Sequence, residues 1–358
     1  MLAPKNFPLK VFVHLFQKVA GVGAEPRKIQ TQTNYKDIMK KTQRTENPYK
    51  NTDTNKRYYT YDYYLRKKYG RKLARIPLDM GLTCPNIDGK CAFGGCIYCS
   101  SRGSGDFAES AALPLKEQYN RARERLSSKW STEHCIAYFQ AHTNTYAPLE
   151  FLKKNFEEVL TFDGLEAISI ATRADCLEPE ICEYLAELAE RIPLTVELGL
   201  QSSNDKTAEF INRGHDFATF CEGYRRLRDA SDKIEISVHI ILGLPTETEK
   251  EMMQTVRDVA SLFPDQVKIH LLHVIRNTVM ADIYERGEYI PLTKEEYVSL
   301  AVKALELLPP DTVVARITGD GHPDDLLAPE WSRKKVSVIN DIDKLLYELG
   351  TYQGKGYK

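Results

Sequence analysis

The sequence predicts an α/β fold built on a parallel sheet that curls into a closed or partly closed barrel. From about residue 75, short β-rich runs alternate with longer amphipathic helical patterns. Strand, helix, strand at this spacing means parallel strands joined by right-handed crossovers. Hydrophobic residues make up 42% of the 358 residues and charged residues 28%, the mixture of a soluble globular protein. Six or seven strand–helix units favour a barrel over an open sheet.

Seven runs rich in β-branched and aromatic residues are expected to be the strands. In chain order they are residues 75–80, 136–140, 167–172, 194–200, 234–242, 267–274 and 312–317. The segments between them have helical periodicity, as in 179–191, whose apolar residues fall on one stripe. A further helix is expected from about residue 297 to 308.

Composition along the chain suggests four parts. Residues 1–55 are polar over much of their length and are expected to form a disordered or extended tail. A basic, Tyr-rich arm or helix follows at 56–76, the barrel core at 77–290 and a C-terminal extension at 291–358. The longest central apolar stretch, 237–245, is far shorter than the roughly 20 residues that span a membrane. We therefore expect no membrane association and a cytoplasmic protein.

The basic arm admits two interpretations. Residues 56–75 contain eight Lys or Arg, one Asp and six Tyr. Basic and aromatic side chains together bind RNA through phosphate pairing and base stacking. An amphipathic helix would instead pack its tyrosines on the barrel and keep its cations in water. We favour the helix, because nothing in the segment is suited to read a base.

Four of the eight cysteines lie within sixteen residues: Cys84, Cys91, Cys96 and Cys99. Thiolates bind zinc and Fe–S clusters, and a Cys-x-x-Cys pair lets two sulfurs reach one metal centre. A structural zinc site would usually have two such pairs, whereas here only Cys96 and Cys99 form one. Three cysteine ligands with one open metal position fit a catalytic site better.

The cysteine segment resembles that of the radical S-adenosylmethionine (SAM) superfamily, and most closely the YhcC-type family. That family shares the pattern Cys-Pro-Asn-x-Asp-Gly…Gly-Gly-Cys-x-x-Cys and is related to the catalytic subunit of elongator and to oxygen-independent coproporphyrinogen oxidase. Eleven residues separate Cys84 from Cys96, which departs from the superfamily's Cys-x3-Cys spacing but agrees with this branch. The resemblance runs from about Arg57 to Asp320. It implies a partial (β/α)6-type TIM barrel.

The resemblance also implies an activity. Cys84, Cys96 and Cys99 would hold a [4Fe–4S] cluster, with Cys91 as an extra cysteine. Reductive cleavage of SAM would give methionine and a 5′-deoxyadenosyl radical that acts on an unidentified substrate. A reductant such as flavodoxin or ferredoxin would supply the electron. One alternative is a radical SAM enzyme that modifies tRNA, with RNA as substrate, and another is a non-catalytic zinc or Fe–S nucleic-acid-binding protein.

Further residues match positions that hold SAM in relatives. Tyr98 corresponds to an aromatic residue beside the adenine, and Gly243 lies in a turn that approaches the adenine. Asn144 and Thr145 follow the second strand, where relatives bind the methionyl amine, although this chain lacks their glycine run. These four residues are candidate cofactor contacts.

Two more residues match a pair in coproporphyrinogen-oxidase-like enzymes. There the amide that corresponds to Gln201 faces the ribose and the guanidinium that corresponds to Arg213 faces the carboxylate. A guanidinium suits a carboxylate because its planar fork can bond both oxygens. His142 and Arg173 lie at the carboxyl ends of strands, where α/β barrels build active sites, and Arg316 precedes the C-terminal tail. These three are candidates for substrate contact.

Overall fold

The parallel sheet expected from the sequence is present in the computed structural model, which describes residues 46–103, 105, 107–319, 321 and 323–358. Seven strands follow the order β1-β2-β3-β4-β5-β6-β8, and each neighbouring pair is parallel. They are β1 (Ala74–Leu78), β2 (Cys135–Phe139), β3 (Leu165–Thr172), β4 (Leu194–Gln201), β5 (Ile234–Leu242), β6 (Gln266–Leu271) and β8 (Val313–Arg316). Most of the predicted tail lies outside the described residues.

The sheet is curled into a partial barrel. Lys268 on β6 places its Nζ 3.3 Å from the hydroxyl of Tyr138 on β2, although three strands lie between them in the sheet. With about 4.8 Å between neighbouring strands, a flat sheet would hold these two strands about 19 Å apart. The inner side chains therefore meet across a concave interior, while β1 and β8 remain the two edges.

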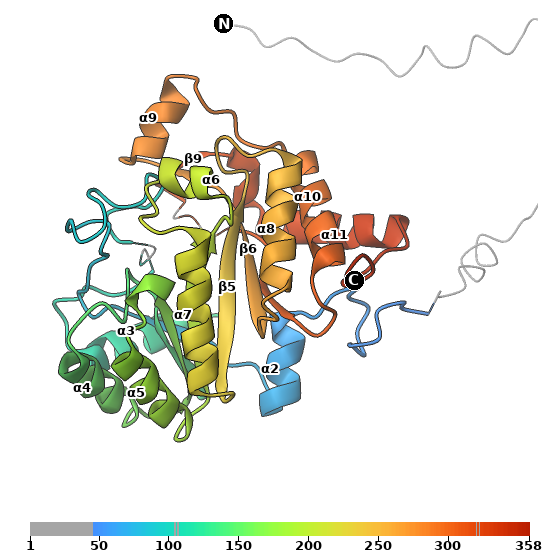
Figure 1. Ribbon diagram of the computed structural model, residues 1–358. Helices are drawn as coiled ribbons and strands as arrows, with labels where there is room; N and C mark the ends of the chain where they lie inside the picture. The colour runs from blue at the N-terminus through green and yellow to red at the C-terminus, as the bar shows by residue number, and fades with distance from the viewer. Residues whose placement is uncertain (1–45, 104, 106, 320, 322) are drawn as a thin grey trace, which may run out of the picture. The chain divides into compact units, whose positions relative to one another are not determined.

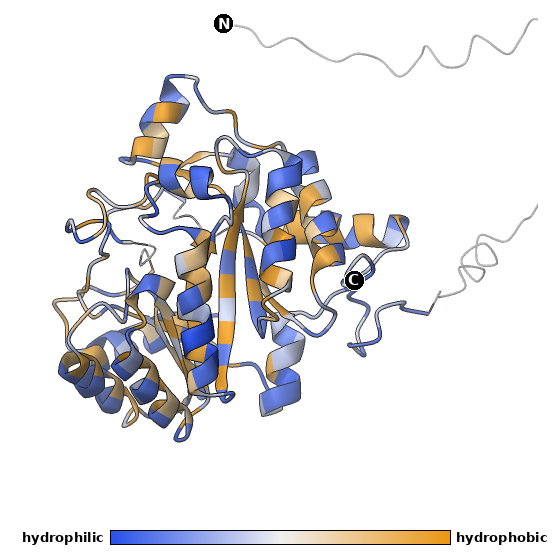
Figure 2. Ribbon diagram, in the orientation of Figure 1, coloured by the Kyte–Doolittle hydropathy of each residue, from blue (hydrophilic) through white to orange (hydrophobic). Residues whose placement is uncertain are grey.

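Amphipathic helices cover the outside of the sheet (Figures 1 and 2). They are α3 (Leu115–Ser127), α4 (Leu149–Val159), α5 (Pro179–Ala189), α7 (Phe217–Ala230), α8 (Glu249–Ala260), α10 (Lys294–Leu307) and α11 (Lys335–Glu348). Capping boxes begin α8, between Thr248 and Glu251, and α10, between Thr293 and Glu296. The expected helices at 179–191 and 297–308 correspond to α5 and α10. None of the helices in the described part of the chain has the length and apolar character needed to cross a bilayer.

The predicted sixth strand is shorter than expected. β6 ends at Leu271, and the next residues form β7 (Val274–Ile275), which pairs antiparallel with β9 (Leu326–Ala328). The backbone N–H of Arg276 also donates to the carbonyl of Asp325 at 2.8 Å. This small ribbon ties the C-terminal segment to the carboxyl end of the barrel.

The basic arm contains the helix α2 (Tyr61–Tyr69), which lies at the amino ends of the strands (Figure 1). Tyr64 donates its hydroxyl hydrogen to a Glu235 oxygen at 2.6 Å, and Lys68 forms an ion pair with the same carboxylate at 2.7 Å. Glu235 is the second residue of β5. The tyrosine and lysine side chains of this helix are thus used, in part, to pack α2 under the barrel.

Candidate active site

The main pocket lies at the carboxyl ends of the strands, where the sequence analysis places the active site. It has a volume of about 230 Å³. The loops after β1, β2, β3 and β8 form part of its wall, and inward-facing side chains of the strands, among them those of β4, β5 and β6, form another part. The pocket is therefore the mouth of the partial barrel.

Three of the four clustered cysteines line this pocket: Cys84, Cys96 and Cys99. They lie on an irregular loop after β1, in which Gly94 and Gly95 have φ angles of 80° and 78°. Glycine adopts this left-handed conformation at no steric cost, so the loop can turn tightly between the sulfurs. The loop thus brings the three predicted ligands to one cavity.

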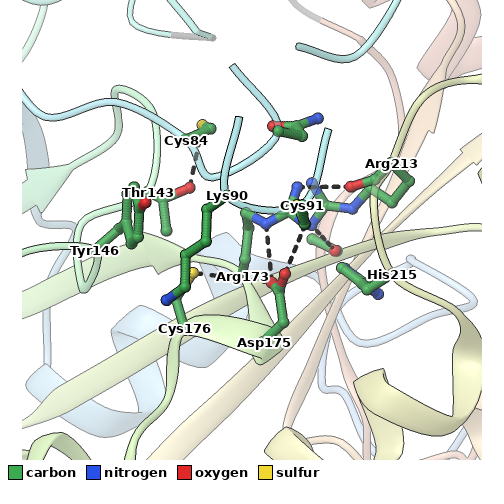
Figure 3. A network of polar contacts seen from close by, with 12 residues as sticks. Cys84, Lys90, Cys91, Thr143, Tyr146, Arg173, Asp175, Cys176, Arg213 and His215 are labelled. Atoms are coloured by element: carbon green, nitrogen blue, oxygen red, sulfur yellow. Dashed lines mark hydrogen bonds and ion pairs between the residues drawn. The ribbon is translucent and has the colours of Figure 1, made fainter. Parts of the chain in front are cut away.

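Polar groups from three segments contact the cysteine sulfurs. The Thr143 hydroxyl donates to Cys84 Sγ at 3.1 Å (Figure 3). The Asn86 side-chain amide donates to Cys96 Sγ at 3.3 Å, and a guanidinium nitrogen of Arg213 lies 4.0 Å from the same sulfur. Such donors favour the thiolate form, which is the form that binds a metal.

The three cysteine sulfurs differ in their electrostatics. The neighbouring Cys99 thiol lowers the pKa of Cys96, and the Arg213 and Arg173 guanidiniums lower it further. Burial raises the pKa of Cys84, and the hydrogen bond with Cys96 raises the pKa of Cys99. Within the described residues, no group of three or more His, Cys, Asp or Glu side chains is gathered as a single metal ion requires. A cluster places each cysteine on a different iron, so three thiols that line one cavity fit it.

Cys91 stands apart from the other three. Its side chain is exposed, and it is not among the described residues that line the pocket. Arg173 approaches Cys91 Sγ at 3.8 Å, but its guanidinium also binds the Asp175 carboxylate at 2.8 and 2.9 Å and the Arg213 carbonyl at 2.7 Å (Figure 3). Arg173 lines the pocket as expected, with its guanidinium held by these partners.

Gln201 and Arg213, the pair matched to coproporphyrinogen-oxidase-like enzymes, come together over Gly199. A Cβ atom at Gly199 would lie 2.7 Å from Gln201 Nε2 and 3.1 Å from an Arg213 nitrogen. Arg213 also donates to the Gly199 carbonyl, and both side chains line the pocket. The absence of a side chain at Gly199 leaves room for these two polar groups.

Three of the predicted cofactor contacts lie elsewhere. The Asn144 amide donates to three backbone carbonyls at 2.9 to 3.1 Å, and the Thr145 hydroxyl donates to the Cys176 carbonyl at 2.6 Å. The Gly243 carbonyl accepts a hydrogen bond from Tyr289 at 2.7 Å. None of the three is among the described residues lining the pocket. The structure assigns the Asn144 and Thr145 side chains to holding the loop after β2.

The remaining predicted residues do line the pocket: Tyr98, His142 and Arg316. His142 has a φ of 57°, and burial lowers its pKa. A Cβ atom at Gly103 would lie 2.4 Å from the His142 ring, so the backbone after the cysteine loop packs directly on the imidazole. The ring is therefore held at the rim.

One feature that the sequence did not predict is a set of hydrogen bonds, here called the clamp, that Asn212 and Asn86 form to hold the cysteine loop. The Asn212 amide donates to the carbonyls of Phe93 and Gly95, both at 2.7 Å. In return the Asn86 amide donates to the Asn212 carbonyl at 2.8 Å. Asn86 belongs to the Cys-Pro-Asn pattern and Asn212 directly precedes Arg213, but nothing in the sequence shows that the two asparagines meet.

A second missed feature is a polar cluster inside the barrel around Glu197 of β4. The Glu197 carboxylate accepts hydrogen bonds from Tyr138 and Ser169 at 2.8 Å and from His239 at 3.1 Å, and it pairs with Arg75 and Lys268. The sequence signal was a charged residue inside an apolar strand, as in Leu-Thr-Val-Glu-Leu. These contacts join β4 to five other strands of the sheet, β1, β2, β3, β5 and β6.

Comparisons with known proteins agree with this fold. The radical SAM superfamily profile matches residues 86–259, and the Radical_SAM C-terminal domain profile matches residues 264–348. The uncharacterized protein YtqA of Bacillus subtilis is 46% identical over 87% of this chain and 96% of its own length. YhcC of Escherichia coli is 31% identical over 80% of this chain and 91% of its own.

Two further matches are more limited. A tRNA uridine(34) acetyltransferase of Methanocaldococcus jannaschii is 32% identical over 43% of this chain and 28% of its own length. The structure of Methanocaldococcus infernus Elp3 superposes with a TM-score of 0.57 at 18% identity, covering 78% of this chain and 64% of that one, and shares the fold.

The chain belongs to the radical SAM superfamily, in the family that contains YtqA and YhcC. It is accordingly a radical SAM enzyme, with a [4Fe–4S] cluster and SAM as its cofactors. This membership displaces the alternative of a non-catalytic zinc or Fe–S protein.

Proposed function

We propose that this enzyme holds its cluster through Cys84, Cys96 and Cys99 and binds SAM against the neighbouring pair Gln201 and Arg213. The observation that carries the proposal is that all five side chains line one pocket at the carboxyl end of the barrel. When bound, the cluster and SAM supply one-electron cleavage of SAM to methionine and a 5′-deoxyadenosyl radical, which takes a hydrogen atom from the substrate. The substrate itself is not identified.

The protein's part in this chemistry is positioning and protection. Thr143 and Asn86 donate hydrogen bonds to the cysteine sulfurs and orient them. Arg213 has a planar fork suited to the SAM carboxylate, and it lies near Cys96. The barrel interior excludes bulk water from a reactive intermediate. A small reducing protein such as flavodoxin or ferredoxin would supply the electron.

The test is anaerobic reconstitution with iron and sulfide, reduction with dithionite and measurement of 5′-deoxyadenosine after SAM is added. We expect product from the wild type and from Cys91→Ala, but a loss of at least about 100-fold in Cys84→Ala. Cys91→Ala is the matched control because it removes a thiol from the same loop. Product from Cys84→Ala at the wild-type level would contradict the ligand assignment.

Modification of tRNA is a second candidate function. The observation that favours it is the partial match to a tRNA uridine(34) acetyltransferase. The basic arm adds little support, because the Tyr64 and Lys68 side chains of α2 contact Glu235 under the barrel. Incubation of the reconstituted enzyme with bulk tRNA should raise 5′-deoxyadenosine formation and change a nucleoside. Unchanged nucleosides and unchanged product formation would remove this candidate.

A further inference from the structure

Part of the pocket wall has no role in the proposed cofactor site. His270 on β6, His273 just after it and Arg316 at the end of β8 all line the pocket. Lys268 and His239 lie close by on β6 and β5, with the His239 and His270 ring centroids 5.2 Å apart. Five side chains that can carry positive charge thus gather on, or just after, three neighbouring strands.

The pocket wall also carries a carboxylate. Among the described residues that line the pocket, the carboxylate is that of Glu197. It already accepts from Tyr138, Ser169 and His239 and pairs with two cations, Arg75 and Lys268. Its charge is therefore balanced within the cluster beneath the pocket.

Two of the histidines present a ring nitrogen without a hydrogen-bond partner. The Nε2 atoms of His270 and His273 are buried, and neither finds a partner in the described structure. Buried polar atoms are nearly always hydrogen-bonded in native proteins. An orphaned pair on the wall of one cavity indicates a ligand that supplies the missing partners.

The backbone after β8 packs against the imidazole ring of His273. A Cβ atom at Gly319 would lie 2.5 Å from the His273 ring, and one at Gly321 would lie 3.0 Å from its Nδ1. Two glycines therefore let the backbone pack on the imidazole and fix it in the wall. Because the backbone packs against it, the His273 ring has one fixed orientation, as a ligand-binding side chain requires.

Electrostatics agree with this geometry. Burial lowers the pKa of His270, of His273 (to about 4) and of Arg316, which means that a positive charge on any of them is penalised in this setting. A bound anion would offset that penalty, as an opposite charge within a few ångströms favours the charged form.

We infer that His270, His273 and Arg316 form a recognition site for an oxyanion on the substrate, either a carboxylate or a phosphate. The inference rests on the proposed function, because it assigns the substrate of that same pocket a chemical class. A guanidinium and imidazole N–H groups are the usual partners of both oxyanions. The substrate hydrogen that is abstracted would then belong to a molecule or group that carries such an anion.

The test is calorimetric titration of the iron–sulfur-loaded enzyme, under anaerobic conditions and with excess SAM to fill the carboxylate site proposed at Arg213. Inorganic phosphate and malonate are the two probes, each at constant ionic strength set with chloride. Tighter binding of malonate assigns a carboxylate and tighter binding of phosphate assigns a phosphate ester. Either result supports the site.

Variants test whether the anion binds at His270, His273 and Arg316. Arg316→Gln and the double variant His270→Gln/His273→Gln should each weaken the better probe about tenfold or more, the effect of losing charge-assisted hydrogen bonds. Arg316→Lys, which keeps the charge, should retain part of the affinity and serves if Arg316→Gln does not fold. Arg276→Gln, at an exposed arginine after β7, is the matched control and should bind like the wild type.

Two outcomes would overturn the inference: neither anion binds the wild type, or the folded variants at positions 316, 270 and 273 bind as tightly as the wild type does. Formation of 5′-deoxyadenosine is measured in the same wild-type preparation. Its absence would count against the proposed function alone, because the anion titration requires no electron transfer.

Discussion

The guanidinium of Arg75, on the first strand, forms an ion pair with the carboxylate of Glu197, on the fourth, across the interior of the barrel. The Glu197 side chain is fully buried, and Lys268 of the sixth strand is its second cationic partner. The burial lowers the pKa of Lys268 well below its usual range despite the pairing. One carboxylate is therefore the shared partner of two basic side chains inside the fold.

Replacing this carboxylate should be strongly destabilising. In Glu197→Gln the two cations would face each other without a counter-charge, and removing one partner of a buried ion pair costs about 3–5 kcal/mol. Urea unfolding followed by circular dichroism measures the loss. Glu187→Gln, at an exposed position of α5, is the control and should stay within about 0.5 kcal/mol of the wild type. Equal stability of the two variants would contradict the role of Glu197.

The clamp on the cysteine loop should be needed for cluster assembly. Asn212→Ala removes two hydrogen bonds to the loop at a residue with φ of 56°, a conformation that Ala adopts poorly. We expect the loop to loosen by about 2–3 kcal/mol. Iron bound per protein after reconstitution should fall, whereas Asn155→Ala on α4 should bind iron like the wild type. Normal iron content in Asn212→Ala would show that the clamp is dispensable.

Stability should fall between acidic and neutral pH because of Glu247. Burial raises the pKa of this carboxyl from 4.5 to about 7, although the Ser202 hydroxyl donates to it. The folded protein thus holds a proton that the unfolded chain releases between pH 4.5 and 7, so this contribution to stability is present below pH 4.5 and is lost as the pH rises to about 7. Glu247→Gln should flatten this part of the pH profile of the free energy of unfolding. An unchanged slope would contradict the assignment.

The helix under the barrel should matter for stability and not for turnover. Tyr64→Phe removes one hydrogen bond to Glu235, which keeps Lys68 as a partner, and should lower the free energy of unfolding by about 1 kcal/mol. Formation of 5′-deoxyadenosine should be unchanged, because α2 lies at the amino ends of the strands. A loss of product at full stability would mean that the arm reaches the active site.

Patterns that are local in sequence predicted much of this structure. The strands of the sheet showed as apolar runs, and the cysteine loop showed in its spacing. Gln201 and Arg213 were paired through a family motif, and the structure brings them together over Gly199. By contrast, β7 has two residues and β9 has three, which is too few to show the alternation of apolar and polar residues that marks a strand.

Local sequence patterns did not predict which side chains face the interior of the pocket. Whether a charged residue in a strand, such as Glu197 or Lys268, faces inward depends on partners from strands distant in sequence. Asn144 and Thr145 show the reverse problem: they follow β2 at the expected place, but backbone carbonyls take up their side-chain donors. Position along the chain indicated the loop, whereas the partners of each side chain depend on the backbone groups that fold around it.

The position of α2 separates two ends of the barrel. This helix packs beneath the amino ends of the strands, through Glu235 near the start of β5, whereas the pocket lies at their carboxyl ends. A molecule that binds at the outer face of α2 would therefore leave the pocket uncovered.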